Sequence, residues 1–356
     1  MTPELAAIRI DELLHNARVR GASDVHFGTD ERTAIRIDGR LIVLDAPAFP
    51  GSAIDTFLAA QLPPAALARL AASGTADAAG RASAIGPYRI HAHRHNGGTR
   101  IVIRLLAPNV PQLAQLGLPP VIASFAQAPL GLVLFTGPTG SGKTTALAAL
   151  IDTINRTSER NIITIEDPIE YVHAPIRSLI SHCEIGRDVT DYAEALRGML
   201  RADPDVILVG EMRDRETMAA ALTAAETGHL VFATLHTNDA AQTIDRIVDA
   251  FPSEAQNQIR AQLAAILVAV VGLRLVPRQG ASGRRAAAEV LVATDGVRNT
   301  IREGKTHQLR NAIVTGRKAG MQTLESDLAS LVARREIELD GALAVSNRPH
   351  EISGAA

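Results

Sequence analysis

The pattern of apolar and polar positions divides the chain into two stretches with different periodicities. In the first stretch, helical spacing over residues 5–19 is followed by strand-like alternation over 23–27 and by two hairpin patterns, 34–43 and 88–106, around Asp38-Gly39 and Asn96-Gly97-Gly98. A helix is expected over 52–62, with Ser52 as its N-cap, and a second helix over 65–72. Mixed strands and helices in this order predict a compact α+β domain over residues 1–107.

The second stretch alternates short apolar runs with helical patterns. The predicted strands are 132–136, 162–165, 206–209, 230–235 and 289–292. This alternation is typical of an α/β fold with a mainly parallel sheet and helices on its faces, where ligands bind at the carboxyl ends of the strands. We therefore predict a second domain over 121–356, joined to the first by a stiff linker, 108–120, that contains four prolines.

A phosphate-binding loop follows the first of these strands. Residues 137–144 match the pattern G-x-x-x-x-G-K-[ST] and precede a run with helical spacing. Backbone N–H groups and a helix N-terminus then point at the phosphates of a nucleotide, Lys143 reaches the β- and γ-phosphates, and the Thr144 hydroxyl helps to hold Mg²⁺. The predicted ATP-binding residues here are Gly137, Pro138, Thr139, Gly140, Ser141, Gly142, Lys143, Thr144 and Thr145.

Acidic residues follow two further strands. Glu166, Asp167 and Glu170 come just after the strand 162–165, and Glu211 follows the strand 206–209. ATP hydrolysis needs a group that orients the attacking water and acidic groups near Mg²⁺, so these positions are candidates for both tasks. Gly210 separates Glu211 from its strand, which departs from the simple Walker B pattern, in which an aspartate ends the strand directly.

Histidines occupy both ends of the predicted strand 230–235. His236 follows its carboxyl end, where it could contact phosphate, whereas His229 precedes it and should lie further from a nucleotide in the same subunit. Three more histidines, at positions 91, 93 and 95, alternate along one strand face. We expect no acidic companion at metal-ligand spacing there, and therefore a solvated strand face.

Composition narrows the class of protein. The 36 basic and 38 acidic residues give a net charge of -2, and aromatic residues are only 3%, so no basic, aromatic-rich stripe for nucleic acid is present. The single cysteine, Cys183, excludes an internal disulfide and a four-cysteine zinc site. The longest apolar run, 263–273, is too short to span a bilayer, and the N-terminus lacks a signal-peptide layout. We expect a cytoplasmic protein that reaches a membrane only through partners.

Four boxes in order resemble those of the secretion-superfamily ATPases, most closely the PilT-type retraction motors of type IV pili. They are residues 137–144, 163–172, 205–214 and 226–237, with further similarity at 21–26, 298–303 and 320–323. The resemblance implies a RecA-like P-loop core, a smaller PAS-like N-terminal domain and a homohexamer that acts on an inner-membrane platform protein of the pilus machine. It also implies Mg²⁺-dependent hydrolysis of ATP to ADP and phosphate.

The resemblance also implies residue roles. Glu170 would orient the attacking water, and Glu211 would be the Walker B acid that acts, with Thr144, on Mg²⁺. Arg89 and Arg104 are similar to family arginines that reach the phosphates; arginine suits this task because its planar fork stabilises developing phosphate charge.

Two departures bear on the direction of the motor. The family's retraction motif usually begins Ala-Ile-Arg-Asn-Leu, whereas here Gly296-Val297 precede Arg298 and Thr300 replaces the leucine. The chain also lacks the extra N-terminal domain and the four-cysteine zinc module usual in assembly ATPases, which favours retraction. The alternatives are an ATPase of a conjugative or type IV secretion system, a non-hydrolysing ATP-binding scaffold at the pilus base, and a RecA-type nucleic-acid translocase.

Overall fold

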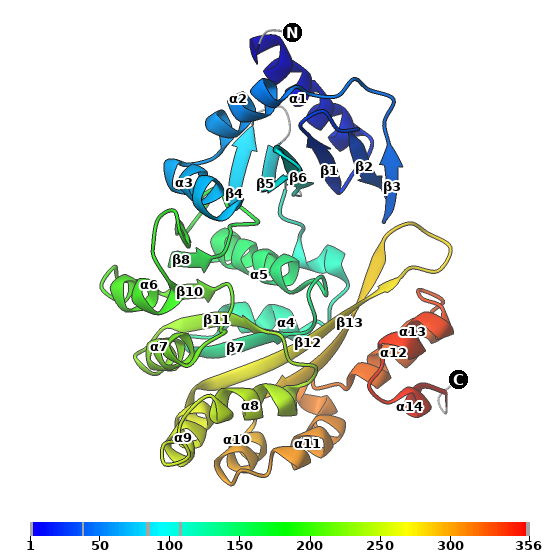
Figure 1. The fold of residues 1–356 in the computed structure, drawn as a ribbon. Coiled ribbons are helices and arrows are strands. Elements are labelled where there is room, and N and C mark those ends of the chain that lie inside the picture. The colour runs from blue at the N-terminus through cyan, green and yellow to red at the C-terminus, as the bar shows by residue number, and fades with distance from the viewer. Residues whose placement is uncertain (1–2, 38, 83–85, 107–108, 354–356) are drawn as a thin grey trace. The chain divides into compact units, whose positions relative to one another are not determined.

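The computed structural model describes residues 3–37, 39–82, 86–106 and 109–353 (Figure 1). Its contacts group into two compact units. One contains Met1–Asn109 together with Pro168–Val172, and the other contains Val110–Asp167 and His173–Ala356. The expected domain boundary at residues 107 and 108 lies outside the described residues, so the ranges 1–107 and 121–356 remain predictions.

The N-terminal unit is an antiparallel sheet covered by helices. Its elements are α1 (Pro3–Val19), β1 (Asp24–Gly28), β2 (Ala34–Ile37), β3 (Arg40–Val43), α2 (Gly51–Gln61), α3 (Pro64–Ser73), β4 (Thr75–Ala82), β5 (Gly86–His95) and β6 (Gly98–Leu105). The strand order is β3-β2-β1-β6-β5-β4. Both expected hairpins are present, with Ile37 opposite Arg40 and His95 opposite Gly98, although Asp38 itself lies outside the described residues.

Two local expectations in this unit were wrong. Ser52 does not cap α2, because the helix begins one residue earlier, at Gly51 after Pro50, and no side chain caps it. Residues 75–82 form the edge strand β4 rather than a polar connection. Small alanine side chains gave this stretch little strand propensity, and pairing with β5 supplies the stability instead.

The second unit is built on a seven-stranded sheet with the order β13-β12-β7-β11-β10-β8-β9. Its elements are α4 (Val121–Ser124), β7 (Gly131–Thr136), α5 (Lys143–Thr157), β8 (Asn161–Glu166), β9 (Leu179–Glu184), α6 (Tyr192–Met199), β10 (Val206–Val209), α7 (Arg215–Glu226), β11 (Leu230–Leu235), α8 (Ala240–Asp249), α9 (Gln256–Ile266), β12 (Leu267–Pro277), β13 (Arg284–Val292), α10 (Asp295–Arg302), α11 (Leu309–Thr315), α12 (Leu324–Ala333), α13 (Leu339–Val345) and α14 (Pro349–Ser353). All neighbouring strands are parallel except β12 and β13.

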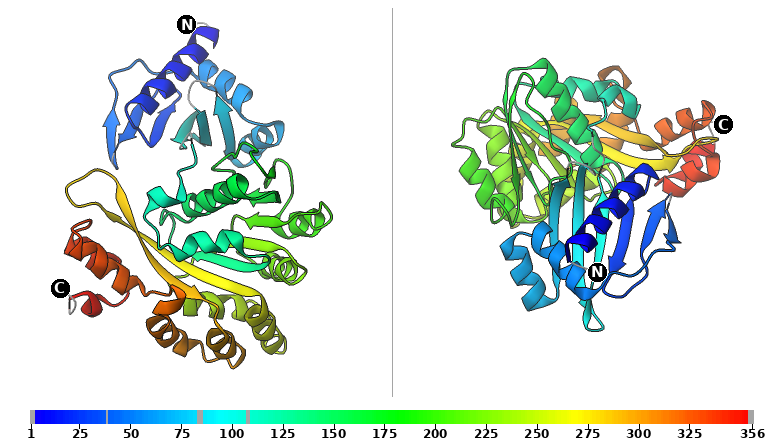
Figure 2. Two further views of the ribbon diagram at one scale, coloured as in Figure 1. Left: turned by 180° about the vertical axis from the view of Figure 1, so that it is seen from behind. Right: turned by 90° about the horizontal axis from the view of Figure 1, so that it is seen from above.

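Helices cover both faces of this sheet. The helices on the two faces can be followed in Figures 1 and 2. Side chains that alternate along β7 divide between two cores: Val133 and Phe135 pack against α5, whereas Leu132 and Leu134 pack in the core that includes α7, α8 and α9. Burial on both faces explains why these strands are apolar throughout. The sheet and its two helical layers agree with the expected α/β fold.

The longest apolar run of the sequence, residues 263–273, does not form a single helix or strand. It contains the end of α9 and most of β12, so this run is divided between a helix and a strand next to the edge of the sheet. Beyond the sheet, α12, α13 and α14 form a further small core against β12 and β13. Among the described residues, no helix is long and apolar enough to cross a membrane.

Candidate nucleotide site

The predicted strand, loop and helix N-terminus are all present around residues 137–144. β7 ends at Thr136, and the loop begins at Gly137 with φ 140°, where a Cβ atom would lie 2.5 Å from the Leu273 carbonyl oxygen. Only glycine fits such a position. α5 begins at Lys143, whose Nζ lies 2.7 Å from the Gly137 carbonyl oxygen and 3.0 Å from that of Pro138. The lysine ammonium is therefore held directly over the loop.

Strand order brings three of the predicted boxes to one sheet edge. β7, β11 and β10 are consecutive and parallel, so the phosphate-binding loop, His236 and Glu211 follow neighbouring carboxyl ends. Parallel strands lie about 4.8 Å apart, which puts the ends of β7 and β10 roughly 10 Å from one another. The site is thus assembled from residues up to 99 positions apart in sequence, Gly137 to His236, as the sheet topology requires.

Glu211 and His236 contact each other directly. Glu211 Oε1 lies 3.1 Å from His236 Nε2, and Glu211 Oε2 lies 2.8 Å from Arg213 Nη2. Burial alone would raise the pKa of Glu211, but the hydrogen bond from Arg213 and the nearby His236 lower it below its ordinary value. The carboxylate is therefore ionised at neutral pH. Arg213 was not among the predicted site residues, although its position two residues after Glu211 was a usable signal.

Gly210 explains the departure from the simple Walker B pattern. A Cβ atom at this position would lie 2.9 Å from the Tyr192 hydroxyl and 3.2 Å from Glu166 Cα. Its backbone N–H donates to the Ile165 carbonyl at 2.7 Å. Because β8 and the Tyr192 ring crowd this position, no side chain fits at the strand end, and the first available acid is Glu211.

His229 lies at the opposite edge of the sheet. It precedes Leu230, which pairs with Gly131 at the start of β7, and its Nδ1 lies 2.8 Å from the Ala224 carbonyl oxygen. The six residues of β11 lie between it and His236, a separation of roughly 23 Å along the extended strand. Within one chain, therefore, His229 does not join the other predicted ATP-binding residues.

Glu170 contacts Arg89 within the first unit. Arg89 Nη2 lies 3.1 Å from Glu170 Oε1, and both side chains are about one-third exposed. Arg104 stands directly opposite Arg89 across the β5–β6 pair, and its Nε donates to Asp24 Oδ1 at 2.9 Å. Both predicted arginines therefore have a carboxylate partner within the first unit.

A small, mostly apolar cavity of about 120 Å³ lies beside the loop. Ser141, Gly142 and Thr145 form one side of it, and Leu118 and Leu275 contribute apolar surface. This cavity was not predicted from the sequence, because its leucines come from the segment before α4 and from β12.

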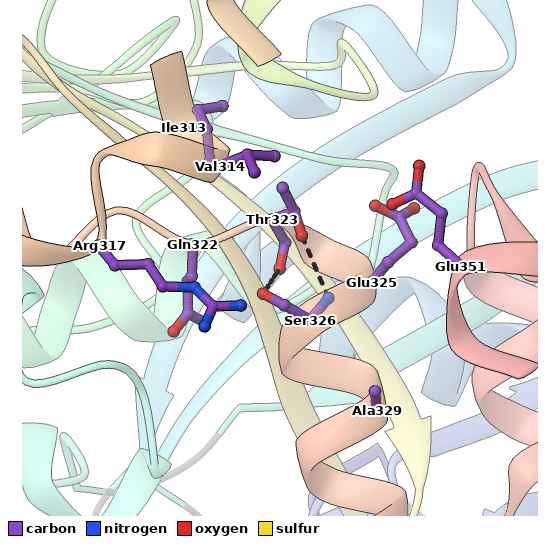
Figure 3. Close-up of a pocket in the computed structure, with 9 residues that line it drawn as sticks. All are labelled: Ile313, Val314, Arg317, Gln322, Thr323, Glu325, Ser326, Ala329 and Glu351. Carbon is purple, nitrogen blue, oxygen red and sulfur yellow. Dashed lines mark hydrogen bonds between the residues drawn. The ribbon is translucent and has the colours of Figure 1, made fainter. Parts of the chain in front are cut away.

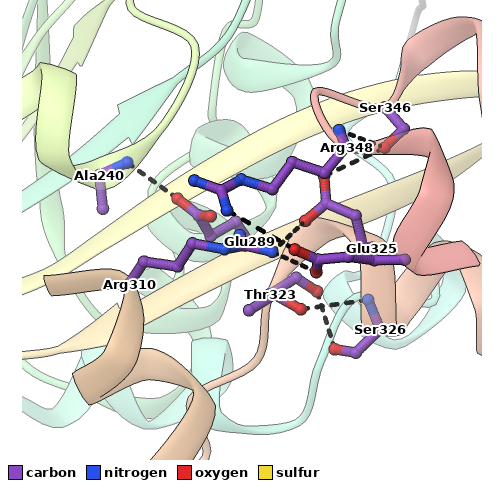
Figure 4. Close-up of polar contacts among 9 residues, drawn as sticks. Ala240, Glu289, Arg310, Thr323, Glu325, Ser326, Ser346 and Arg348 are labelled. Carbon is purple, nitrogen blue, oxygen red and sulfur yellow. Dashed lines mark hydrogen bonds and ion pairs between the residues drawn. The ribbon is translucent and has the colours of Figure 1, made fainter. Parts of the chain in front are cut away.

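Two other features of the second unit lie apart from the predicted boxes. A cavity of about 250 Å³ is lined from α11, α12 and α14 and contains no predicted site residue (Figure 3). Near it, Arg310 contacts both Glu325, at 3.1 Å, and Glu351 (Figure 4). In the same view, the N–H of Ala240, at the start of α8, donates to Glu289 Oε1 at 2.8 Å. The Arg310 contacts join α11 to α12 and α14, and the Ala240–Glu289 bond joins β13 to α8, the helix that follows the histidine box.

The histidine-rich strand does have acidic companions, which corrects one expectation. His91 Nδ1 lies 2.9 Å from Asp77 on β4, and His95 Nε2 lies 3.2 Å from Glu31. Asp77 stands opposite His91 in the β4–β5 pair, and Glu31 comes from the loop after β1, so the tertiary structure reveals both partners. Nevertheless, in the described part of the chain no group of three or more histidine, cysteine or acidic side chains could hold a metal ion.

The sheet edge suits a hard cation held largely by a bound phosphate. Glu211 offers an ionised carboxylate, and Thr144, in the first turn of α5, offers a hydroxyl. Mg²⁺ prefers such oxygen ligands and typically takes only one or two from the protein when phosphate oxygens supply others. These residues therefore fit the metal that the family implies.

The chain matches the family model described as "Type II/IV secretion system protein" over residues 4–342. The chain belongs to this family. Its relatives within the family include the type IV pilus retraction ATPase PilT of Pseudomonas aeruginosa, 42% identical over 94% of this chain and 96% of that protein. A twitching motility protein of Neisseria gonorrhoeae is 49% identical over 245 residues, 69% of this chain and 66% of that protein.

Solved structures give the same result for the fold of this family member. The crystal structure of the pilus retraction motor PilT with bound ADP matches with a TM-score of 0.89 at 40% identity, and covers 97% of this chain and 99% of that one. This match confirms the expected fold class, an α/β P-loop core with a smaller N-terminal domain. The resemblance that the four boxes indicated is likewise confirmed.

Proposed function

We propose that this protein is an ATP hydrolase that powers the retraction of type IV pili. The observation that carries the proposal is the sheet edge that joins the phosphate-binding loop to Glu211 and His236, in a chain similar to PilT along nearly its whole length. Filled catalytic positions argue against a non-hydrolysing scaffold. Similarity to two proteins of pilus retraction and twitching argues against a secretion motor.

The proposed chemistry divides between binding and hydrolysis. The loop residues 137–145 bind the phosphates, and the Lys143 ammonium leaves the loop carbonyls to contact the β- and γ-phosphates. Glu170 orients the attacking water, and Arg89 and Arg104 stabilise the charge that develops on the phosphoryl group. His236, through its contact with Glu211, senses the phosphate at the same edge.

Thr144 and Glu211 are the proposed ligands of Mg²⁺. When bound, the ion neutralises phosphate charge that the loop alone leaves uncompensated. The apolar cavity beside Thr145 is the proposed site of the nucleotide base, because Leu118 and Leu275 offer a surface on which a planar ring can pack.

The proposed working form is a homohexamer on the cytoplasmic side of the inner membrane, in contact with the platform protein of the pilus machine. In this hexamer, His229 is proposed to reach the nucleotide of a neighbouring subunit, because it lies far from its own loop. No direct contact with nucleic acid is proposed.

Two measurements test the proposed function. A deletion strain should be hyperpiliated and unable to twitch; loss of protein or DNA export with normal twitching would instead favour a secretion motor. Purified protein should release phosphate from ATP, and a chain that binds ATP without releasing phosphate would be a scaffold.

Paired variants test the division of labour. Lys143→Ala removes a phosphate contact and should weaken ATP binding, whereas Glu170→Gln should keep binding and abolish turnover. Nucleotide titration and phosphate release on the same preparations measure both quantities. If Glu170→Gln keeps near-wild-type hydrolysis, Glu166 becomes the candidate for orienting the water.

A further inference from the structure

The segment that carries Glu170 has no helix or strand of its own. Between β8, which ends at Glu166, and β9, which begins at Leu179, the chain makes only bends and irregular turns. Its buried residues are Ile169, His173 and Ser178, so water can satisfy much of the remaining backbone, and the course of the segment is fixed by side chains that bond to it. The position of Glu170 therefore depends on side chains that hold the segment.

Asn155, near the end of α5, holds the later part of the segment. Its side chain is fully buried, and its Nδ2 donates to the Ala174 carbonyl at 2.8 Å while its Oδ1 accepts from the Ile176 N–H at 2.9 Å. A helix that begins at the phosphate-binding loop thus also fixes the chain that follows the acidic box.

His182, on β9, holds the segment closer to Glu170. Its Nε2 accepts a hydrogen bond from the backbone N–H of His173 at 3.1 Å. Since Nε2 accepts, the ring proton must be on Nδ1, which lies 2.8 Å from Thr164 Oγ1 on β8. The imidazole therefore bridges the central sheet and the segment, with each ring nitrogen in a defined role.

The surroundings of His182 keep this arrangement rigid. The His173 ring stacks on the His182 ring with centroids 5.7 Å apart and an interplanar angle of 12°. Burial, and then the neighbouring His182, lower the pKa of His173 to about 4, so His173 is neutral at physiological pH. The buried Glu166 carboxylate lies 3.9 Å from His182 Nδ1, on the same side as Thr164.

We propose that His182 is a positioning residue for ATP hydrolysis, which acts by fixing the end of the segment that carries Glu170. Its hydrogen bonds reach Thr164 and the backbone of His173, three residues beyond Glu170. The inference rests on the proposed role of Glu170. It goes further by assigning a positioning role in hydrolysis to a side chain outside the four boxes.

The test compares two substitutions in the full-length protein. His182→Leu removes both ring nitrogens, whereas His182→Gln keeps one acceptor for the His173 N–H and one donor for Thr164. Since misplacement of a reacting group by about 1 Å can cost on the order of 100-fold in rate, His182→Leu should lower the single-turnover hydrolysis rate tenfold or more, and leave ATP affinity within about twofold. His182→Gln should restore most of the rate. The exposed His307, on the short turn 306–308, provides a control, and His307→Leu should change neither quantity.

The outcomes separate this inference from the proposed function. If the wild type hydrolyses ATP and Glu170→Gln is inactive, an unchanged rate in His182→Leu overturns the positioning role alone. Equal losses of rate and affinity, or no recovery in His182→Gln, also overturn it. If the wild type does not hydrolyse ATP, the proposed function fails first. Should His182→Leu not fold, Thr164→Val, which removes the partner of Nδ1, must show the same selective loss of rate, and a normal rate there refutes the proposal.

Discussion

At the scale of single residues, the polar and charged neighbours of each candidate side chain determine its ionisation and its binding partners. Glu211 is ionised because Arg213 and His236 outweigh its burial, and the Lys143 ammonium donates to the carbonyl oxygens of Gly137 and Pro138. In the N-terminal unit, Arg104 is held by a carboxylate, that of Asp24.

A substitution of Arg104 distinguishes a role in hydrolysis from a role confined to its ion pair with Asp24. Arg104→Ala should leave ATP affinity nearly intact and lower the hydrolysis rate on the order of 10³-fold, as loss of a transition-state arginine does elsewhere, with Arg89→Ala similar or milder. Arg100→Ala is the matched control, since Arg100 lies on the same strand and pairs with Glu31 at 3.6 Å. Affinity and single-turnover rate are measured together. An unchanged rate would mean that Arg104 serves only to pair with the nearly buried Asp24.

At the scale of elements, the end of β10 shows how packing selects a residue type. Gly210→Ala should lower the free energy of unfolding by about 1–3 kcal/mol, because the new methyl group overpacks the contact with Tyr192 and Glu166. Glu211 should shift with the strand end, so hydrolysis should fall as well. Chemical denaturation and phosphate release measure the two effects.

Gly198 provides the control for that change. It lies in α6, and a Cβ atom there would have no neighbour within 4 Å. Gly198→Ala should keep activity and leave stability unchanged or raised by about 0.5–1 kcal/mol, because alanine favours a helix. Equal behaviour of the two alanine variants would contradict the packing explanation.

Glu289 on β13, which accepts a hydrogen bond from Ala240 at the start of α8, should make the stability of the protein depend on pH. Burial, and to a smaller extent Asp239 and Glu325, raise the pKa of Glu289 from its ordinary 4.5 to about 7. The folded state then binds more protons than the unfolded state between these values. Stability should therefore fall as pH rises from about 4.5 to 7, by at most about 1.4 kcal/mol per pH unit.

Glu289→Gln isolates this contribution, because the amide oxygen can still accept from Ala240 and cannot ionise. Urea unfolding at pH 5.5 and pH 8 should show the wild type losing stability relative to the variant at the higher pH. A difference between the two proteins that stays constant with pH would show that Glu289 is ionised throughout.

At the scale of the whole molecule, the separation of His229 from its own loop leads to a prediction about assembly. The protein should form closed rings, with six subunits by the family resemblance, because heterologous contacts that close form rings. Light scattering with ATP at working concentration should report a hexamer. A persistent monomer with full ATPase activity would contradict both the ring and the shared site.

The sequence by itself determined the features that depend on local pattern. Residues 137–144 specify their loop because only glycine tolerates the backbone at Gly137, and the apolar runs of β7, β10 and β11 specify buried strands because both faces are covered. The order of strands and helices then fixed the fold class, and with it the sheet edge where the acids gather.

Tertiary structure decided everything that depends on a neighbour distant in the chain. Residues 75–82 became a strand through pairing with β5, and residues 263–273 were divided between α9 and β12. The need for glycine at position 210 follows from the position of Tyr192. The hydrogen bond between His182 and the His173 backbone forms because β9 pairs with β8 as the outermost strand of the sheet. Hydrophobic periodicity records which face of an element is buried, but carries no information about which side chain from elsewhere will meet it.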